Sequence, residues 1–552
     1  LGFRRAKHLL RRASYNYSKR QIELFSSKTP AEAINLLFVN TNNILEYGPY
    51  DPSDTVNGFW TSLSLDPNSF SGVTRKRTQV CGWWWYNAIK EVSLKHKLTF
   101  FLHTSFTVGK DSGTGNASNF YDYLCLLEYY SYGNIKELAK KITLDNSMLV
   151  YLDNTSNNAN NPNENYAREF LELFTILKGP QIGEENYTNY TEIDVQKAAK
   201  VFSGYKRQGD RTIIDSETSI PIGFINIDKH DISDKEFSSA FNETIIGGID
   251  EIGALQELDD FVEMVFAQEA TSISYCKKLY RFFVKSEISE EVENDIIIPL
   301  AAFMVSENYE IIPVLTKLLT SQHFYDKDDS DETNEIIGSL VKSPLQLITE
   351  VVTMFNLELP EPPNPVSPNL PFNNPGDPIS NPDGALQYYK NFFQLFVHNS
   401  FLNGAGFEFF NPDSVAGYPA LYQEPDYDRH WFRSNTLIAR YKLIESLIAG
   451  KNTITNGIIY ATLDAISFAE NNISDPSDSI LLVIELSELL YPESIDNDRV
   501  KYFVNFLIDG YNEYYWTSEW GKYENTGDTS VIKTRLNDLV IAMVNAAEFQ
   551  LM

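Results

Sequence analysis

The feature that most constrains the fold is a series of long segments in which apolar side chains recur at helical spacing. The clearest, residues 84–107, contains neither Pro nor Gly. Apolar stripes of this kind favour helices that bury one side. We therefore predict a mainly α fold, a large multi-helix array. The other helices are predicted at 121–143, 161–178, 191–205, 255–284, 291–323, 333–356, 386–400, 433–448, 480–490, 497–513 and 530–548.

Two regions interrupt this helical pattern. Residues 206–250 contain Pro and Gly and alternate apolar with polar residues, which predicts a small irregular or β-hairpin insertion. Residues 357–385 are rich in Pro and Asn, which predicts an exposed linker or long loop without regular structure. This linker divides an N-terminal helical lobe, 1–356, from a C-terminal helical lobe, 386–552.

The charge balance limits the classes of partner. The 552 residues include 75 acidic and 45 basic side chains, for a formal net charge of -30. A chain this acidic repels phosphate backbones, so nucleic acid is not expected as a partner. The sequence lacks the common nucleotide-binding, zincin and hydrolase signatures. It also lacks the run of about 18 apolar residues that crosses a bilayer.

The three cysteines limit the disulfide and metal chemistry that the chain can support. Cys81, Cys125 and Cys276 lie far apart in apolar contexts, without a CxxC pair. This spacing excludes a disulfide framework and a Cys-rich zinc site. One pair could still bridge, but buried free thiols are the expected state. No signal peptide is visible, which leaves open whether one precedes Leu1.

The stretch "NPNENYAREFLELFT", residues 161–175, has the pattern of an amphipathic helix with an unusually crowded polar face. Asn161 is the expected N-cap, Pro162 the first helical residue, and Glu164 the partner in an arrangement like a capping box. The polar face gathers Glu164, Asn165, Arg168, Glu169 and Glu172. From pattern alone, such a face is a solvated helix surface.

Other polar groups are candidates for chemistry. The loop before this helix supplies Asp153 and Asn154, and oxygen-rich loops can hold a hard cation, although Asn-rich loops also form simple turns. His103 lies on an aromatic stripe, and His230 stands next to Asp231. If a cofactor is present, these residues favour a divalent cation, with His230 and Asp231 as metal ligands.

Aromatic and acidic residues are dense in residues 411–441, around Trp431. Trp and Tyr can form platforms that bind sugars or proteins, and they can equally anchor an ordered loop. Trp431 is therefore a candidate binding residue.

Several segments together resemble a known bacterial family. They include "MLVYLDN" with "NPNENYAREFLELFT", and they run in the family's order almost from end to end. The others are "AKHLLRRASY" (6–15), "LKHKLTFFLHTSFTVGK" (94–110), "YTEIDVQKAAKVFSGY" (190–205), "KHDISDK" (229–235), "ATSISYCKKLYRFFV" (270–284), "FFNPDSVAGYPA" and "WFRSNTLIARY". The chain is thus similar to the family called domain of unknown function 1800.

The chain departs from the family pattern at four positions. The family usually has His-x-His in its second motif, whereas this chain has His103 followed by Ser105. Tyr205 and Tyr418 replace Trp, and Asn16 replaces Gly. The missing second His weakens any metal site built on that pair.

The resemblance implies a helical, exported protein of the periplasm, cell surface or medium, without a defined reaction. Family members are often encoded beside a second exported, sulfatase-like family, which implies a protein partner. The triplets "DTV", "DSV" and "DSI" look like O-glycosylation sites of Bacteroidota secretory proteins. The expected function is binding or assembly.

The resemblance also changes the interpretation of the polar face. Because that face coincides with the family's most specific motif, we expect it to be buried, and a buried polar network must be satisfied throughout. The acids and Arg168 would pair with Arg11, Arg12, Asn154 and His103. Arg168 is expected to be mostly buried with a carboxylate partner.

Two enzyme classes are the alternatives. In a hydrolase, Glu164 or Glu169 would be the general base and His103 its partner, because burial can tune carboxylates for acid–base work. In a haem or metal oxidoreductase, His103 would be the ligand, although no CxxCH motif is present. An active site would gather His103, Glu164 and Glu169. The surrounding candidates are Asp153, Asn154, Asn165, Arg168, Glu172, His230 and Asp231.

Overall fold

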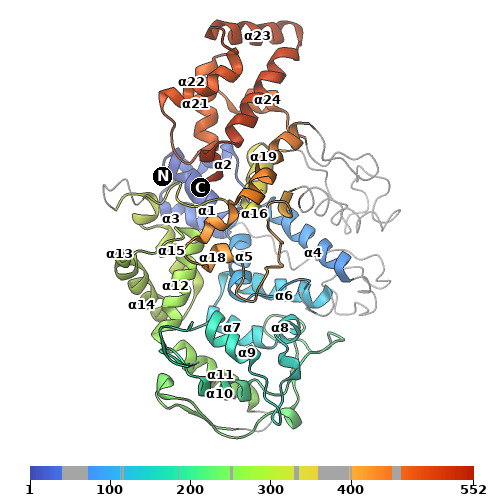
Figure 1. The fold of residues 1–552 in the computed structure, drawn as a ribbon, viewed down its shortest axis with the longest axis vertical. Coiled ribbons are helices and arrows are strands. Elements are labelled where there is room, and N and C mark those ends of the chain that lie inside the picture. The colour runs from blue at the N-terminus through green and yellow to red at the C-terminus, as the bar shows by residue number, and fades with distance from the viewer. Residues whose placement is uncertain are drawn as a thin grey trace.

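The structure, a computed structural model, is an elongated, mainly helical array (Figure 1). It describes the chain outside residues 40–72, 112–113, 115–116, 185, 249–252, 329–334, 358–396, 398–400 and 450–461. The predicted fold class is confirmed. The proposed linker 357–385 lies almost wholly outside the described residues, so the division into two lobes stays a prediction.

The middle of the molecule combines helices from both ends of the sequence (Figure 1). Those from the first part of the chain are α1 (Phe3–Ala13), α2 (Lys19–Ser26), α3 (Pro30–Val39), α4 (Val73–Ala88), α5 (Lys95–Ser105) and α6 (Ala117–Tyr129). The later ones are α12 (Glu269–Phe283), α13 (Glu290–Val292), α14 (Ile298–Ser306), α15 (Ile311–Leu319), α16 (Pro344–Met354), α18 (Pro419–Tyr422) and α19 (Ser434–Ile448).

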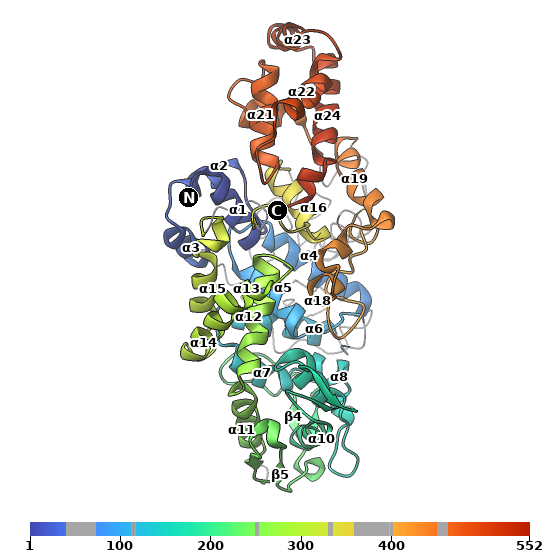
Figure 2. The same ribbon diagram turned by 60° about the vertical axis from the view of Figure 1, so that its left-hand side comes forward.

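The two ends of the molecule are each built from one stretch of sequence (Figure 2). One end carries α20 (Ala465–Asn472), α21 (Ser479–Leu490), α22 (Asn497–Ile508), α23 (Glu513–Thr526) and α24 (Ser530–Val544). The other carries α7 (Ile135–Thr143), α8 (Asn146–Tyr151), α9 (Asn165–Glu169), α10 (Glu192–Val201) and α11 (Ala254–Phe266). None of the described helices is both long and apolar enough to cross a lipid bilayer.

Three short antiparallel sheets of two strands each lie at this second end in the described part of the chain. Their strands are β1 (Gln181–Gly183) with β2 (Asn186–Tyr187), β3 (Tyr205–Lys206) with β4 (Phe224–Ile225), and β5 (Lys235–Glu236) with β6 (Ile245–Ile246). The predicted irregular or hairpin insertion around 206–250 is therefore confirmed for its described residues.

Several predicted helices have different ends in the structure. The expected continuous helix 84–107 is two helices, because α4 ends at Ala88 and α5 begins at Lys95. Between them, the Ser93 hydroxyl accepts a hydrogen bond from the Lys95 amide, so this side chain holds the start of α5. The predicted helix 191–205 begins as expected, with a capping box between Thr191 and Asp194.

The helix predicted to begin at Pro162 begins at Asn165 instead. Asn161 does not cap it, because Asn161 pairs with Asn158 in a tight loop. The Asn163 side chain accepts a hydrogen bond from the Asn165 amide, which favours a turn over a helical start. The helix then widens into a π-helical turn over Phe170–Phe174.

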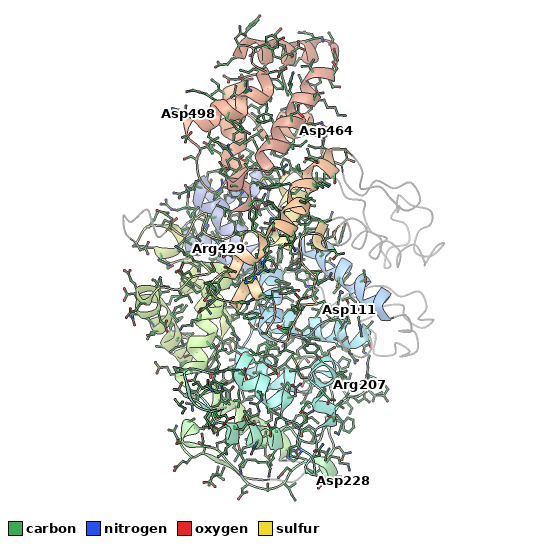
Figure 3. All side chains as sticks on the ribbon, viewed as in Figure 1. Asp111, Arg207, Asp228, Arg429, Asp464 and Asp498 are labelled. Atoms are coloured by element: carbon green, nitrogen blue, oxygen red, sulfur yellow. The ribbon has the colours of Figure 1, made fainter. Side chains whose placement is uncertain are left out.

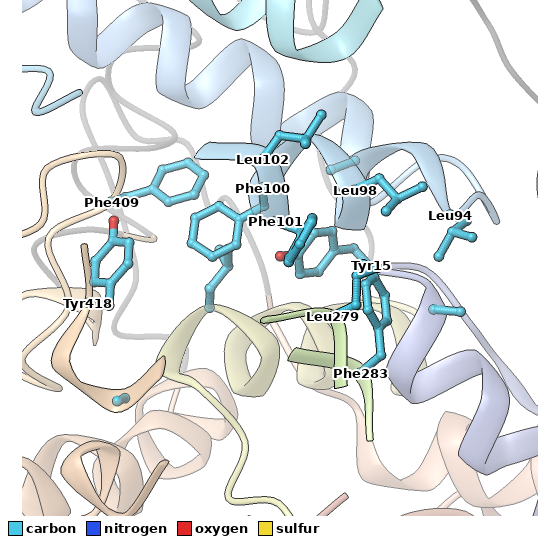
Figure 4. Packing of buried hydrophobic residues seen from close by; sticks show 14 of the residues in the cluster. Tyr15, Leu94, Leu98, Phe100, Phe101, Leu102, Leu279, Phe283, Phe409 and Tyr418 are labelled. Carbon is cyan, nitrogen blue, oxygen red and sulfur yellow. The ribbon is translucent and has the colours of Figure 1, made fainter. Parts of the chain in front are cut away.

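One contiguous apolar core runs through the molecule, with α5 at its centre (Figure 4). Phe100 lies between the aromatic rings of Phe409 and Tyr418, whose centroids are 6.2 and 5.9 Å away. Cys81, Cys125 and Cys276 are buried free thiols, as predicted. Figure 3 shows charged side chains such as Asp111, Asp464 and Asp498 at the periphery, where they are exposed.

A buried ion cluster ties the chain's two ends to the middle. Glu350 on α16 accepts from Arg11 on α1 at 2.8 Å and from Lys342 at 2.9 Å. Arg11 also donates to the Leu490 carbonyl at the end of α21, at 2.6 Å. Burial alone would raise the pKa of Glu350, but the two adjacent cations outweigh burial and lower it. Glu350 is therefore a carboxylate that holds three helices together.

We expect Glu350→Gln to lower the free energy of unfolding by about 3–5 kcal/mol, because it leaves two buried cations without a counter-ion. The control is Glu548→Gln, which removes the partner of Arg499 at a half-exposed site and should cost about 1 kcal/mol or less. Urea denaturation of both variants measures the difference. Equal losses would contradict the role of Glu350.

Candidate functional site

The polar side chains of the Asn-rich signature loop form hydrogen bonds within the loop itself. The Asp153 carboxylate accepts from the Ser156 hydroxyl at 2.7 Å and from the Asn163 amide at 3.2 Å. Asn165 donates to the Leu152 carbonyl at 3.0 Å. Asp153 itself has a left-handed backbone, with φ 53°. Asx turns of this kind explain why Asn and Asp are dense in this loop, and the explanation requires no metal ion.

The same loop is joined to the end of α10. Asn157 donates to the Asn154 side chain and to the Ala199 carbonyl, while Asn154 donates to the Phe202 carbonyl. Gly204 has φ 81°, and a Cβ there would lie 2.7 Å from the Asn226 carbonyl oxygen. Only glycine fits this approach. The structure thus brings Asp153, Asn154 and Asn165 together in one structural clasp.

Arg168 has carboxylate partners, as predicted, but it is less buried than expected. It pairs with Glu164 at 3.3 Å and with Glu192 on α10 at 2.8 Å, and 32% of its side-chain surface is exposed to solvent. Within the described residues, the predicted pairs between this face and Arg11, Arg12, Asn154 or His103 do not form; that part of the prediction is wrong. The reason is that α9 packs on α10 rather than on α1.

The remaining acids of this face are also near solvent. Glu172 bonds to Lys178 and accepts from the Tyr190 hydroxyl at 3.0 Å. Glu169 is half-buried, and burial together with the neighbouring Glu172 raises its pKa to about 7. Glu169 could therefore exchange a proton near neutral pH, yet within the described residues it shares no hydrogen bond or ion pair with His103.

His103 is sealed in an aromatic shell. Its ring is fully buried, with the Phe410 centroid at 4.9 Å and Phe100 at 5.8 Å. The Tyr123 hydroxyl donates to the Phe106 carbonyl at 2.7 Å, so its oxygen accepts from His103 Nδ1 at 3.0 Å. Burial lowers the pKa of His103 to about 3. The ring is thus neutral at physiological pH and closed to a substrate.

His230 and Asp231 point to different partners. His230 Nδ1 bonds to the Ser203 carbonyl at 2.8 Å, and its other ring nitrogen lies 3.3 Å from Glu257. Asp231 pairs with Lys200 at 3.2 Å. In the part of the chain that the structure describes, no group of three or more His, Cys, Asp or Glu side chains is placed to hold a metal ion.

A different site lies in the middle of the molecule. A cavity of about 50 Å³ lies among α5, α12, α16 and α18, and it has room for about three or four water-sized atoms. The buried part of its wall consists of Tyr15, Lys97, Phe100, Leu340, Gln346, Ala420, Asp428, Trp431 and Met552. Half-buried residues, including Arg281 and Leu421, complete it.

Lys97 is the buried amine of this cavity. It is 4% exposed and donates to the Gln346 side-chain oxygen, and its ammonium nitrogen lies 4.3 Å from the centre of the Tyr15 ring. It forms no ion pair within the described residues. Burial lowers the pKa of Lys97 to about 7, with Arg12 lowering it further and Glu350 acting in the opposite direction.

The other polar groups of the cavity divide into satisfied and unsatisfied ones. Asp428 is satisfied, because it accepts from the Ser286 hydroxyl at 2.8 Å and from the Val341 amide at 2.6 Å. Gln346 Nε2 and Arg281 Nε are buried without a hydrogen-bond partner. Unpaired buried donors are costly, so a ligand acceptor that reached these two nitrogen atoms would be favoured.

Trp431, singled out from the sequence, lines this cavity. It is 7% exposed and packs on Phe407 and Tyr418, with ring centroids 5.5 and 6.0 Å away. It is therefore a wall of an internal site rather than an exposed platform. Its role in binding stays a prediction.

A family model described as protein of unknown function, DUF1800, matches residues 8–551. The chain belongs to the DUF1800 family. No curated protein and no solved structure matches it.

The family segments of this DUF1800 chain converge on the cavity. Tyr15 comes from the opening segment, Lys97 and Phe100 from the second, and Arg281 from "ATSISYCKKLYRFFV". Trp431 begins "WFRSNTLIARY". By contrast, the signature at 161–175 contributes no residue to the cavity wall. This signature thus lies apart from the cavity.

Sequence reasoning missed Lys97, Gln346 and Asp428. Lys97 carried a partial signal, because it lies in a helical segment directly before Leu98, Phe100, Phe101 and Leu102. Every residue of α5 except Thr104 is buried. A lysine in such a helix must either find a partner or lose its proton. Gln346 and Asp428 had no comparable signal, because only the tertiary fold brings them to Lys97.

Lys97→Met should change the pH dependence of stability. The folded pKa of about 7 lies below the ordinary value, so the unfolded chain binds more protons between about pH 7 and 10. Wild-type stability therefore rises with pH in this window, by at most about 1.4 kcal/mol per pH unit relative to the variant. At pH 7 the variant should be equally stable or more stable. Urea denaturation at several pH values checks this; parallel profiles would contradict it.

Proposed function

We propose that this DUF1800 protein is a binding component whose ligand is a small molecule with a carboxylate group, held in the central cavity. One observation carries the proposal: Lys97 and the unpaired donors of Gln346 and Arg281 line the same partly enclosed space. Carboxylates accept several hydrogen bonds and match a set of donors.

The electrostatics of the cavity support an anion. Lys97 stands on its wall without a paired acid, and the acid there, Asp428, is already bound to two donors. Arg281 adds a second positive charge, although its guanidinium lies 3.8 Å from Glu424 and donates to the Tyr427 hydroxyl. The aromatic rings of Tyr15, Phe100 and Trp431 supply an apolar wall that excludes water. A short aliphatic acid matches both the size and the chemistry of this space.

The geometry gives less support to the hydrolase alternative. A general base must reach its substrate, and His103 is neutral and enclosed by aromatic rings. Glu164 is engaged with Arg168 on a different surface. The oxidoreductase alternative would place a metal or haem on His103, where Phe100, Phe410 and Tyr418 occupy the surroundings.

We expect wild-type protein to bind acetate with a Kd on the order of 1 mM, as suits a ligand of four non-hydrogen atoms. Binding should weaken as pH rises from 6.5 to 9, because Lys97 then loses its charge. Titration of ¹³C-labelled acetate, followed by NMR at constant ionic strength, measures both effects.

Three variants make this titration specific. Ala420→Leu fills the cavity and should abolish acetate binding, whereas Ala31→Leu makes the same change at an exposed position and should leave it intact. Lys97→Met should weaken binding at least tenfold if the ammonium contributes about 1.4 kcal/mol or more. Equal acetate binding by all four proteins would refute the cavity as the site.

We further propose that the protein works outside the cytoplasm, in the periplasm, at the cell surface or after secretion, beside an exported sulfatase-like protein. The family resemblance and the glycosylation-like triplets support this proposal. We expect the tagged protein in its native cells to fractionate with extracytoplasmic markers. It should also co-purify with the sulfatase-like neighbour after crosslinking. Recovery with a cytoplasmic marker enzyme would exclude the location.

A further inference from the structure

We propose that Lys97 is a nucleophile that forms a reversible imine with a small carbonyl compound, such as an aldehyde or a short oxo acid, in the central cavity. This inference rests on the proposed function, because it uses the same cavity, and it deepens that function by naming a ligand class. It adds a covalent step to a site that otherwise only binds.

The surroundings of Lys97 favour the neutral amine over the charged ammonium form. Its nitrogen bonds to the neutral oxygen of Gln346, and within the described residues no carboxylate pairs with it. Other buried lysines do have one, as with Lys342 on Glu350 and Lys235 on Glu257. A paired carboxylate favours the ammonium form of a lysine, and at Lys342 burial outweighs that effect. At Lys97 no paired carboxylate opposes burial within the described residues.

The charged groups around Lys97 act in both directions. Arg12 and the low polarity of the site disfavour the ammonium form, whereas Glu350 favours it. Arg281 and Asp428 complete the charges on the cavity wall. With a pKa of about 7, roughly half of the Lys97 amines are unprotonated at pH 7, against about one in 2,500 for a lysine of ordinary pKa.

The second requirement of imine chemistry is room for the electrophile. The cavity reaches Lys97 and accommodates about three or four non-hydrogen atoms, which matches a short carbonyl compound. Its apolar rings limit the water that would hydrolyse the product. A buried amine without an adjoining cavity would have the low basicity but no place for a reactant.

The step balances without a further reagent. The Lys97 nitrogen lone pair attacks the carbonyl carbon, and the carbonyl π electrons move to oxygen, which takes up a proton released from the nitrogen. Loss of that hydroxyl with the second amine proton gives water and a carbon–nitrogen double bond. Amine and carbonyl thus yield imine and water, and no oxidant or reductant takes part.

The test is trapping with glyoxylate, which carries a carboxylate and an aldehyde, in the presence of sodium cyanoborohydride. Glyoxylate leaves four non-hydrogen atoms on Lys97, because its aldehyde oxygen departs as water. Full-length protein is incubated at pH 7 and digested, and mass spectrometry locates the reduced secondary amine. We expect Lys97 to be modified at least tenfold more than surface lysines, since its unprotonated fraction is far larger. Acetate should compete with labelling.

Internal controls separate cavity chemistry from amine basicity. Burial also lowers the pKa values of Lys278 and Lys342 to about 7, but neither residue lines the cavity. Both should stay unmodified in the same sample, so this comparison needs no variant. Ala420→Leu keeps Lys97 and should remove its labelling, whereas Ala31→Leu should not.

The outcomes distinguish this inference from the proposed function. Selective modification of Lys97 that is lost in Ala420→Leu supports it. Acetate binding without modification of Lys97 overturns the covalent step and leaves the binding function in place. Equal modification of Lys97, Lys278 and Lys342 overturns it as well, because basicity alone would then explain the result. If the protein neither binds acetate nor is labelled at Lys97, both proposals are overturned.

Discussion

Glu350 lies between two cations that come from distant parts of the chain, Arg11 on α1 and Lys342 just before α16. Two positive charges in an apolar interior are tolerated only with a counter-ion close by. The carboxylate therefore fixes where α1 can lie relative to α16, and Arg11 in turn reaches the end of α21. The walls of the cavity follow from this placement, because Tyr15 follows α1 and Gln346 lies on α16.

The signature motif and the cavity perform different tasks. In the Asn-rich loop, amide side chains substitute for backbone partners where the chain turns too sharply for regular structure. Such residues are specific because each satisfies a particular donor or acceptor, and a specific pattern of this kind needs no ligand. In the cavity, by contrast, Gln346 and Arg281 keep donors without partners. Unfulfilled hydrogen-bonding capacity is the better guide to binding in this fold.

The mainly helical class, the start of the helix at Thr191 and the buried thiols were predictable, because each depends on residues that are neighbours in sequence or on composition. The start of α9 was not, since Pro162 and Glu164 match a helix start while Asn163 forms a competing turn. The polar face of α9 was assigned the wrong neighbours, because periodicity shows which side is polar but not what lies opposite. Lys97 was visible as a charge in an apolar helix, but its cavity depends on segments more than 200 residues away.

The hydrogen bonds that α1 makes with the end of the chain have a consequence for the timing of folding. Arg12 donates to the Met552 carbonyl at 2.6 Å, and Lys7 bonds to the Tyr491 carbonyl. A ribosome needs roughly half a minute to two minutes to synthesise the intervening residues. Until then, these two bonds of α1 cannot form. Helix α1 is thus fully locked in place late, and the wall of the central cavity is complete only once Met552, which belongs to it, has been made.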